Sequence, residues 1–346
     1  MRDPAPVNLL TFDVEGFVEA SQDIVDSPPA RRSPQREREE IELNTVAILD
    51  LLAELEQRAT FFVLGRIGRD MTWLVRRIVQ AGHEIACHSF EHRRLHRLAP
   101  PQVRAALEAA KRHLEDAGGH PVAGFRAPDF SITEQNLWVF DVLREVGFTY
   151  DSSVYPTGLH DVYGIRDFPP GPVRLANGLI EIPLSARRVL GWGIPFGGGG
   201  YLRLYPLAIT RWLYRAHNRQ GWPGVLYLHP YEMGRVIPRI DGLSMVRTFR
   251  TYVGVKGAAR KLAALIRERP FVAIEDYLAR YPVQELSWRP GSPSERPQET
   301  GRASRGRCAN EWQSLEERPA SPGAHRMIRN LRAGDAGTRA RGVSAR

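Results

Sequence analysis

Two histidines four positions apart, His88 and His92, have the spacing of a metal-binding pair. If the chain turns into a helix at Ser89, their Cβ atoms lie about 6 Å apart on one face, close enough for both imidazoles to bind one ion. In a continuing strand they would lie roughly 13 Å apart and could not share an ion. A pair on a solvated helix face has the same spacing, so the interpretation depends on which other polar residues lie nearby.

Three further segments place polar side chains where strands are expected to end. They are Asp13 with Glu15, Arg126 with Asp129, and His229, after apolar runs that end near residues 13, 126 and 228. The carboxyl ends of parallel strands meet at one edge of a sheet, where catalytic residues of α/β proteins gather. Each feature alone has an ordinary explanation, but their joint placement with His88 predicts a site.

The elements that would position these residues alternate along the chain. We expect strands at residues 7–13, 59–64, 82–87, 122–126, 148–152, 179–184, 225–228 and 271–274. We expect helices at residues 41–57, 70–81, 100–117, 135–145, 206–220 and 246–267, and a polar loop at 22–39. Repeated strand–helix units predict an α/β fold with a parallel sheet, closed as a barrel or open and doubly wound, and we favour a barrel.

Composition and charge restrict the class of protein. The 346 residues, 42% hydrophobic and 25% charged, are enough to bury a large core. The formal net charge is +9, but from residue 291 onward 11 arginines face 6 acidic residues, so +5 of it lies in this last part. The rest is only mildly basic, and no nucleic-acid partner is expected.

The terminal segments and the cysteines predict a cytoplasmic protein. Cys87 and Cys308 lie far apart in the sequence and suggest no disulfide framework. No apolar signal segment precedes the first expected strand, and no run is long and apolar enough to span a membrane. Residues 289–346 are rich in Gly, Ser, Pro, Arg and Ala, so we expect a disordered basic tail there.

Four motifs in order resemble the polysaccharide deacetylases of carbohydrate esterase family four, the NodB homology domain. They are T-F-D at 11–13, H-S-x-x-H at 88–92, R-A-P at 126–128 and L-x-L-H at 226–229. A finer resemblance, to the exosortase-associated (PEP-CTERM locus) deacetylases, rests on T-F-D-V-E at 11–15, A-T-F-F-V-L-G at 59–65, F-R-A-P-D-F-S-I at 125–132, G-G-G-G-Y-L-R-L at 197–204 and H-P-Y-E at 229–232. The resemblance implies a distorted (β/α) barrel of the polysaccharide deacetylase type. Its catalytic domain would cover residues 1–288, with a family-specific C-terminal region from about residue 150.

The resemblance also implies metal-assisted hydrolysis of N-acetyl groups on amino sugars, with His88 and His92 as metal ligands. One departure concerns the third ligand: Val14 stands where the family has a second acidic residue. Glu15 lies two positions after Asp13, so on an extended segment both point to the same side and Glu15 could replace the missing ligand. Zn²⁺ suits two imidazoles and one oxygen, and Co²⁺, Ni²⁺ or Fe²⁺ would also fit.

The family reaction assigns a role to each remaining motif residue. Asp13 is the expected general base, Arg126 holds it ionised, and His229 donates a proton to the departing amine. A backbone N–H at Asp129 would share the oxyanion with the metal. The expected substrate contacts are Leu228 and Trp192 as an apolar wall for the acetyl methyl group, and Tyr231 as a stacking surface for sugar.

The expected partner is an N-acetylated poly- or oligosaccharide, or a lipid-linked glycan precursor, with peripheral association to a glycan-assembly machinery. Two other functions fit the same residues. A related amide hydrolase acting on a small cyclic imide or ureide would use a similar barrel, with a small closed cleft. A glycan-binding protein with a weakened metal site would bind sugar without cleaving it.

Overall fold

The computed structural model describes residues 7–20, 33–158, 163–189, 192–239 and 243–285. The expected tail at 289–346 and most of the expected loop at 22–39 therefore lie outside the described residues. Within the described part, no helix combines the length and the apolar character that crossing a membrane requires.

Ten strands form one curled sheet. Its order is β10-β1-β2-β3-β4-β5-β7-β6-β12, and β11 also pairs with β1. The strands are β1 (Asn8–Val14), β2 (Thr60–Val63), β3 (Glu84–Cys87), β4 (Gly124–Phe125), β5 (Tyr150–Asp151), β6 (Val173–Arg174), β7 (Ile180–Glu181), β10 (Val225–Leu228), β11 (Phe271–Val272) and β12 (Gln284–Glu285). A separate antiparallel pair joins β8 (Ala186–Val189) to β9 (Trp192–Pro195). All neighbours in the large sheet are parallel except β6 and β7. This arrangement confirms the predicted distorted (β/α) barrel.

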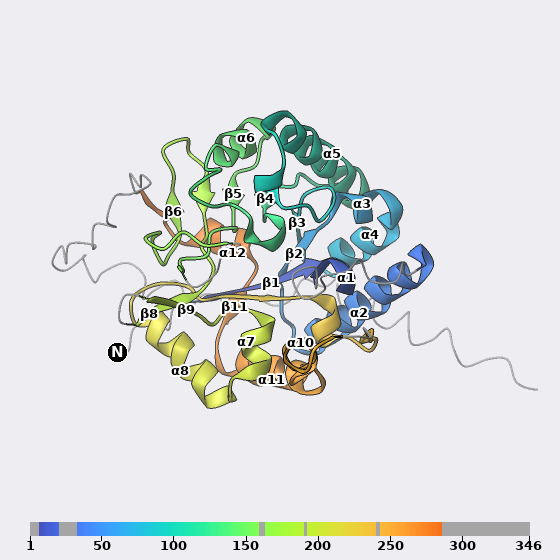
Figure 1. Cartoon of the computed structure of the whole chain (residues 1–346), viewed down its shortest axis with the longest axis vertical. Helices are drawn as coiled ribbons and strands as arrows, with labels where there is room; N and C mark the ends of the chain where they lie inside the picture. The colour runs from blue at the N-terminus through green and yellow to red at the C-terminus, as the bar shows by residue number, and fades with distance from the viewer. Residues whose placement is uncertain (1–6, 21–32, 159–162, 190–191, 240–242, 286–346) are drawn as a thin grey trace, which may run out of the picture. The chain divides into compact units, whose positions relative to one another are not determined.

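Helices cover the outside of the sheet, as Figure 1 shows for α2 to α6 beside β1 to β5. The α-helices are α1 (Phe17–Ala20), α2 (Pro34–Glu54), α3 (Gly65–Asp70), α4 (Thr72–Gln80), α5 (Pro100–Gly118), α6 (Val139–Val146), α7 (Gly199–Leu204), α8 (Leu207–Asn218), α9 (Pro230–Met233), α10 (Met245–Tyr252), α11 (Val255–Glu268) and α12 (Ile274–Arg280). Two 3₁₀ turns, η1 (Leu95–Arg97) and η2 (Pro128–Phe130), complete the set.

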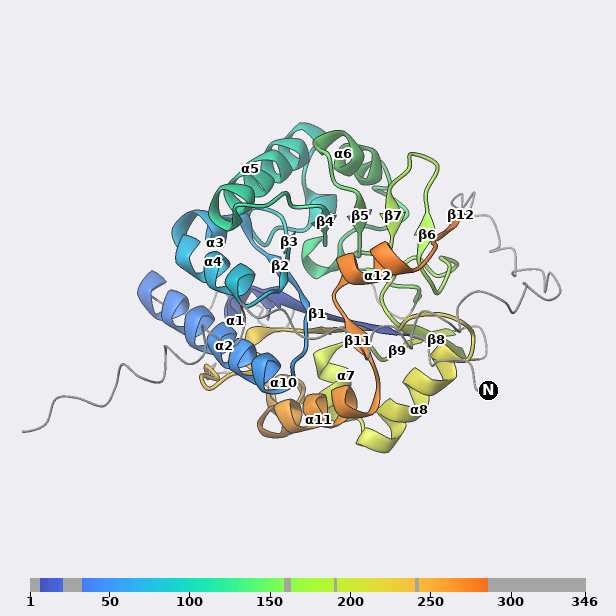
Figure 2. The ribbon, with the colours of Figure 1, turned by 180° about the vertical axis from the view of Figure 1, so that it is seen from behind.

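Alternate residues of the strands face two different layers, as the period of two requires. In β1, Leu10 and Phe12 belong to the core under the helices, the helix-side core, whereas Leu9 belongs to an interior cluster on the opposite face. Asp13 has the same parity as Leu9 and therefore lies on the interior side. Helix α12 lies at the amino end of the strands and covers that end of the sheet (Figure 2). Its first residue, Ile274, belongs to the interior cluster.

Two predicted helix boundaries are wrong for local reasons. Helix α2 begins at Pro34, seven residues before the expected start, because the Ser33 side chain accepts a hydrogen bond from Arg36 N and caps the first turn. The expected helix at 246–267 is two helices, α10 and α11. Gly254 lies between them with φ +69°, a left-handed conformation that ends a helix.

Three of the four glycines at 197–200 pack closely against β10 and the start of α9. A Cβ atom on Gly197 would lie 2.1 Å from Val225 O, one on Gly198 would lie 2.5 Å from Tyr227 Oη, and one on Gly199 would lie 1.9 Å from Glu232 Oε2. Only residues without a side chain allow this close approach. The run leads into α7, which begins at Gly199.

Replacing Gly197 by alanine is therefore expected to destabilise the protein by about 1–3 kcal/mol or more, since the obstructing atom belongs to the backbone. Gly200→Ala is the matched control, because its Cβ would meet nothing closer than Arg203 Nη2 at 3.9 Å. Alanine there should be neutral or stabilise α7 by up to about 1 kcal/mol. Urea unfolding measures both. Equal stabilities for the two variants would show that the packing of this run does not constrain the fold.

Candidate active site

The end of β1 delivers two carboxylates to the interior side of the sheet. Asp13 and Glu15 are buried and line the same cleft, whereas Val14 between them is buried in the helix-side core. An acidic side chain at position 14 would point away from the cleft. The alternation of β1 therefore places Glu15, two residues after Asp13, where it can take part in a site.

His88 and His92 meet in a loop and not on a helix, contrary to the expected local structure. Ser89 has φ +68°, and the carbonyls of Ser89 and Phe90 accept hydrogen bonds from the first N–H groups of α3, at 2.8 and 3.0 Å. These contacts replace the intrahelical bonds that a turn at 88–92 would need. The loop still brings the two imidazole rings to a centroid separation of 5.4 Å.

Glu15, His88 and His92 together form a candidate metal site. One ligand atom from each lies within 4.8 Å of the others, and all three residues are buried. Glu15 Oε2 lies 2.7 Å from His92 Nε2 and 3.5 Å from His88 Nε2. The Nδ1 atom of His88 lies 2.9 Å from Arg126 O, and because a carbonyl can only accept, Nδ1 donates this bond and Nε2 is the ring atom that faces the site. Two imidazoles and a carboxylate are a donor set that suits Zn²⁺ and its neighbours.

The electrostatics of this cluster favour a charged carboxylate. Burial opposes ionisation of Glu15, but attraction to His92 and hydrogen bonds to His229, His88 and His92 outweigh it and hold the Glu15 pKa well below its usual value. Burial opposes protonation of His92, but Glu15 raises the pKa of His92 to about 9. The same carboxylate that attracts a proton to His92 would attract a cation.

Arg126 holds Asp13 in place from the floor of the cleft. Arg126 Nη1 donates to Asp13 Oδ1 at 2.7 Å, and the two side chains are 0% and 2% exposed. The guanidinium also donates to Thr11 Oγ1, to Ser152 O and to Ser152 Oγ, at 2.8 to 3.0 Å, and it lies over the Phe62 ring. A buried arginine with all these partners fixes the position of Asp13.

His229 faces Glu15 from the other side and has its own acidic partner. Its Nε2 lies 3.2 Å from Glu15 Oε1, and its Nδ1 lies 3.2 Å from Glu232 Oε2. Burial favours neutral His229, but its hydrogen bonds to Glu15 and Glu232 outweigh this effect and raise the His229 pKa well above its usual value. Burial opposes ionisation of Glu232, but Arg203 at 2.8 Å and His229 lower the Glu232 pKa to about 2. At neutral pH, His229 is therefore a cation placed between two carboxylates.

Asp129 places its backbone at the cleft in a left-handed conformation, with φ +51°. Its carboxylate accepts from Arg94 Nε at 2.7 Å and is therefore already paired. The following N–H groups, of Phe130 and Ser131, donate to Ala127 O and to Pro128 O. Among the described residues, no hydrogen-bond acceptor lies opposite the N–H of Asp129.

These side chains surround a cleft of about 140 Å³. Its lining is Asp13, Glu15, Ala20, His88, His92, Asp129, Phe130, Tyr163, Tyr227 and His229. Leu228 does not reach it, contrary to expectation: it pairs in register with Phe12 and points into the helix-side core, so Tyr227 lines the cleft in its place.

The other two expected substrate contacts also differ in placement. Tyr231 is buried and does not line the cleft; its ring stacks on that of His229 at 5.7 Å and so supports the histidine. Trp192 begins β9, but its side chain lies outside the described residues.

The sequence analysis did not assign Glu232 or the cleft residues Ala20, Phe130, Tyr163 and Tyr227 to the site. Glu232 carries a readable signal, because H-P-Y-E at 229–232 has the spacing of a capping box, and Glu232 Oε2 indeed accepts from His229 N at 3.0 Å. Tyr163 lies in a stretch without periodicity, and nothing in its sequence context marks it as a cleft residue.

Comparison with known families agrees with this geometry. Residues 4–150, which contain Asp13, Glu15, His88, His92 and Arg126, match the family described as polysaccharide deacetylase. This part of the chain is therefore similar to polysaccharide deacetylases. Residues 152–279 match a second family, described as a domain of unknown function (DUF3473).

The named proteins that are similar to this chain match it over only part of their length. A chitooligosaccharide deacetylase of Sinorhizobium fredii is 37% identical over 100 residues, which are 29% of this chain and 44% of that protein. A bifunctional xylanase/deacetylase of Pseudobutyrivibrio xylanivorans is 30% identical over 89 residues, which are 25% of this chain and 15% of that protein. The chain thus spans less than half the length of these relatives.

A crystal structure from Mycobacterium smegmatis, described as that of a polysaccharide deacetylase, has the same fold. It superposes with a TM-score of 0.54 at 20% identity and covers 84% of this chain and 96% of that chain. Similarity at this level of identity concerns the fold.

The two family matches meet in one site. The segment similar to polysaccharide deacetylases supplies β1, and the second matched segment supplies the neighbouring strand β10, with Leu9 paired to Val225. His229 and Glu232 thus come from the segment that matches the domain of unknown function, whereas Glu15, which His229 contacts, comes from the segment similar to deacetylases.

Proposed function

We propose that the protein is a metal-dependent hydrolase that removes N-acetyl groups from amino sugars of a poly- or oligosaccharide, or of a lipid-linked glycan precursor, and releases acetate. The observation that carries this proposal is the convergence of three elements in one cleft: the cluster of Glu15, His88 and His92, the Asp13–Arg126 pair, and the His229–Glu232 pair. The match to polysaccharide deacetylases supports it.

In this proposal His88, His92 and Glu15 hold a divalent ion, with Zn²⁺ the best fit to the donor set. When bound, such an ion supplies a Lewis acid and makes a water molecule more acidic. The chain's own contribution is to fix the ligands. His88 is oriented by its hydrogen bond to Arg126 O, and Glu15 is kept ionised by the surrounding imidazoles.

Asp13 is the proposed general base that takes a proton from the attacking water. Its hydrogen bond from Arg126 fixes the direction of the carboxylate. The N–H of Asp129 is a candidate donor to the oxyanion that forms at the acetyl carbonyl, because Asp129 lines the cleft. Phe130, Tyr163 and Tyr227 provide the aromatic surface that would face the substrate.

His229 is the proposed general acid, which protonates the departing amine. With Glu15 bound to a metal ion, Glu232 remains the anion beside His229 Nδ1 and keeps Nε2 protonated. Arg203 fixes Glu232 in turn. The acid side and the base side of the cleft thus each have a carboxylate paired with a buried arginine.

We further propose that the chain belongs to the exosortase-associated deacetylases and that its catalytic domain continues to about residue 288. The second family match, over residues 152–279, supports a region added to the deacetylase domain. Strand β12 (Gln284–Glu285), which follows the second matched segment, still pairs with β6 of the large sheet.

The test is acetate release from N-acetylated oligosaccharides of different sugars, measured with the purified protein after chelation and after return of a single divalent metal. We expect release only with metal. Hydantoin, a cyclic ureide, is assayed in parallel. Hydrolysis of hydantoin without acetate release from any oligosaccharide would show that the substrate is a cyclic ureide and not a glycan. Stoichiometric sugar binding without acetate release in the presence of metal would indicate a glycan-binding protein.

Replacing His229 by alanine is expected to lower kcat about 10²- to 10⁴-fold with little change in metal affinity, since it would remove the proton donor. Glu232→Gln tests the carboxylate that pairs with His229. Loss of the anion lowers the His229 pKa, so the alkaline limb of the kcat profile should move to lower pH. Chelator titration measures metal affinity in both variants. A large loss of metal in His229→Ala would make His229 a ligand.

A further inference from the structure

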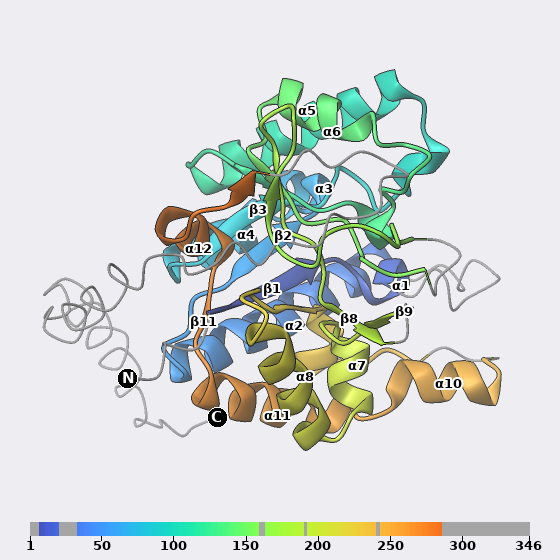
Figure 3. The same ribbon diagram turned by 90° about the vertical axis from the view of Figure 1, so that its left-hand side faces the viewer.

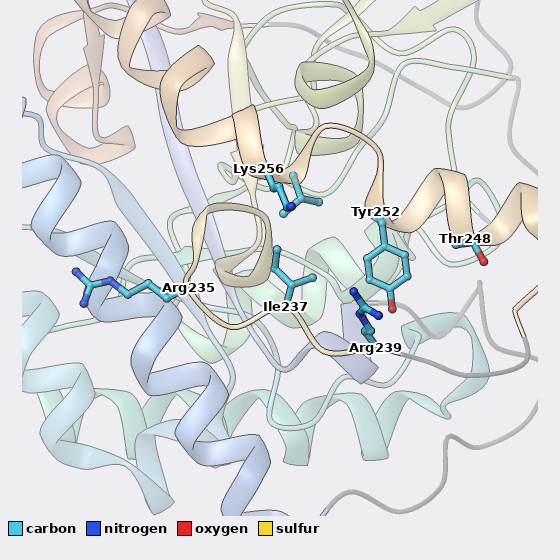
Figure 4. Close-up of a pocket in the computed structure, with 7 residues that line it drawn as sticks. Arg235, Ile237, Arg239, Thr248, Tyr252 and Lys256 are labelled. Carbon is cyan, nitrogen blue, oxygen red and sulfur yellow. The ribbon is translucent and has the colours of Figure 1, made fainter.

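A larger hollow lies apart from the cleft and shares no residue with it. This groove, of about 580 Å³, lies between the loop at 235–239 and helices α10 and α11. Its lining is Arg235, Ile237, Arg239, Thr248, Tyr252, Val255 and Lys256, most of them shown in Figure 4. Three of these seven side chains are cationic, and none is acidic.

Helix α10, which forms one side of the groove, exposes apolar side chains. Met245, Val246 and Phe249 are 89%, 69% and 57% exposed, the highest values among the large hydrophobic residues that the structure describes. Positions i, i+1 and i+4 form one stripe along a helix. On α10 only Thr251 is buried, so the helix contacts the body of the protein by a narrow face. Figure 3 shows α10 extending outward on the side where α1 and the β8–β9 pair lie.

The surroundings of this stripe are cationic. The described residues between 233 and 257 contain five cationic and no acidic side chains. The cations are Arg235, Arg239, Arg247, Arg250 and Lys256; the one acidic residue of this stretch, Asp241, lies outside the described residues. Arg235 lies 3.6 Å from Asp50, and both of those side chains are largely exposed, so this pair neutralises little of the positive charge.

We propose that α10 and the cationic groove bind the surface of an anionic membrane. An amphipathic helix with aliphatic and aromatic residues on one side and arginines beside them lies in a bilayer interface, with the apolar stripe among the acyl chains. The cations of the groove then meet lipid phosphates. We favour a bilayer over a protein groove because the stripe covers little more than one turn, whereas the positive charge extends well beyond it, over the loop and the start of α11.

The membrane face is connected to the catalytic cleft. Arg203 Nη1 donates to Thr251 O at 2.9 Å, and Arg203 Nε donates to Glu232, the partner of His229. Burial raises the pKa of Tyr163, which lines the cleft, and the nearby charge of Arg250 opposes this shift. The end of α10 is thus fixed beside the site, and a membrane bound to α10 would lie near the cleft mouth.

Vesicle co-sedimentation of the full-length protein tests the proposal, without reference to deacetylation. The probes are vesicles of phosphatidylcholine alone and vesicles that also contain phosphatidylglycerol. The test variant is Phe249→Ser with Arg250→Glu, which removes one apolar and one cationic side chain from α10. The control variant is Trp73→Ser with Arg77→Glu on α4, which makes the same kind of change at another exposed site. Thermal unfolding compares the folding of all three proteins.

We expect the wild type and the control to bind the anionic vesicles equally, and less at high salt. The α10 variant should bind at least tenfold more weakly. Should its unfolding midpoint fall, Met245→Ser with Val246→Ser replaces it. No binding by the wild type, undiminished binding by the α10 variants, or equal loss in the control would each overturn the proposal. A wild-type dimer that the α10 change separates, without vesicle binding, would make α10 a surface for a second copy of the chain.

Discussion

Replacing His88 or His92 by alanine is expected to remove the bound metal and to lower acetate release more than about a hundredfold. Each imidazole is one of three candidate ligands, and loss of a partner that merely orients a ligand already costs about 10- to 100-fold. Metal content per chain is measured by mass spectrometry after dialysis, and acetate release is measured on an oligosaccharide that the wild type deacetylates.

His120→Ala is the matched control, because His120 is exposed beyond the end of α5 and does not line the cleft. It should retain both metal and activity. His88 and His92 are buried, so the thermal unfolding midpoints of the metal-free proteins must show that the variants still fold. A His88→Ala, His92→Ala double variant with full activity would disprove the metal site.

The sequence predicted the barrel because its buried strands have a clear signature. The apolar runs near residues 9, 62 and 226 are continuous, as buried parallel strands require, and each is followed by turn residues or a helix. The parity of β1 then placed Asp13 and Glu15 on one side. Helix starts were harder to predict, since α2 begins in a polar stretch whose only signal is Ser33 followed by Pro34.

The parts that could not be predicted depend on register and on distant contacts. Leu228 was assigned to the cleft because it belongs to the L-x-L-H motif at 226–229, but it pairs in register with Phe12 and lies on the helix-side face of β10, opposite to Tyr227. Residues 88–92 do not form a helix, because the carbonyls of Ser89 and Phe90 accept hydrogen bonds from the first N–H groups of α3. These bonds depend on how the two elements pack. The polar residues at the strand ends could therefore be identified from the sequence, whereas the residues that they contact in the fold could not.

The burial of Asp13 with Arg126 also has a consequence for stability. Asp13→Asn retains an oxygen that can accept from Arg126 but leaves a buried guanidinium without its closest counter-charge. Breaking a buried pair in this way costs up to roughly 3–5 kcal/mol. Urea unfolding of the metal-free protein should show this loss. Activity must therefore be compared under conditions where the Asp13→Asn variant is fully folded.

Under those conditions, Asp13→Asn and Glu15→Ala are expected to separate base from ligand. The amide that replaces the Asp13 carboxylate cannot take up a proton, so turnover should fall about 10²- to 10⁴-fold while metal stays bound. Glu15→Ala removes the one carboxylate within reach of both imidazoles, so metal affinity should fall along with activity. Chelator titration and acetate release are measured on each variant. If metal were retained in Glu15→Ala but lost in Asp13→Asn, the two roles would be reversed. Asp13 would then be the metal ligand, and Arg126 could not be its permanent partner.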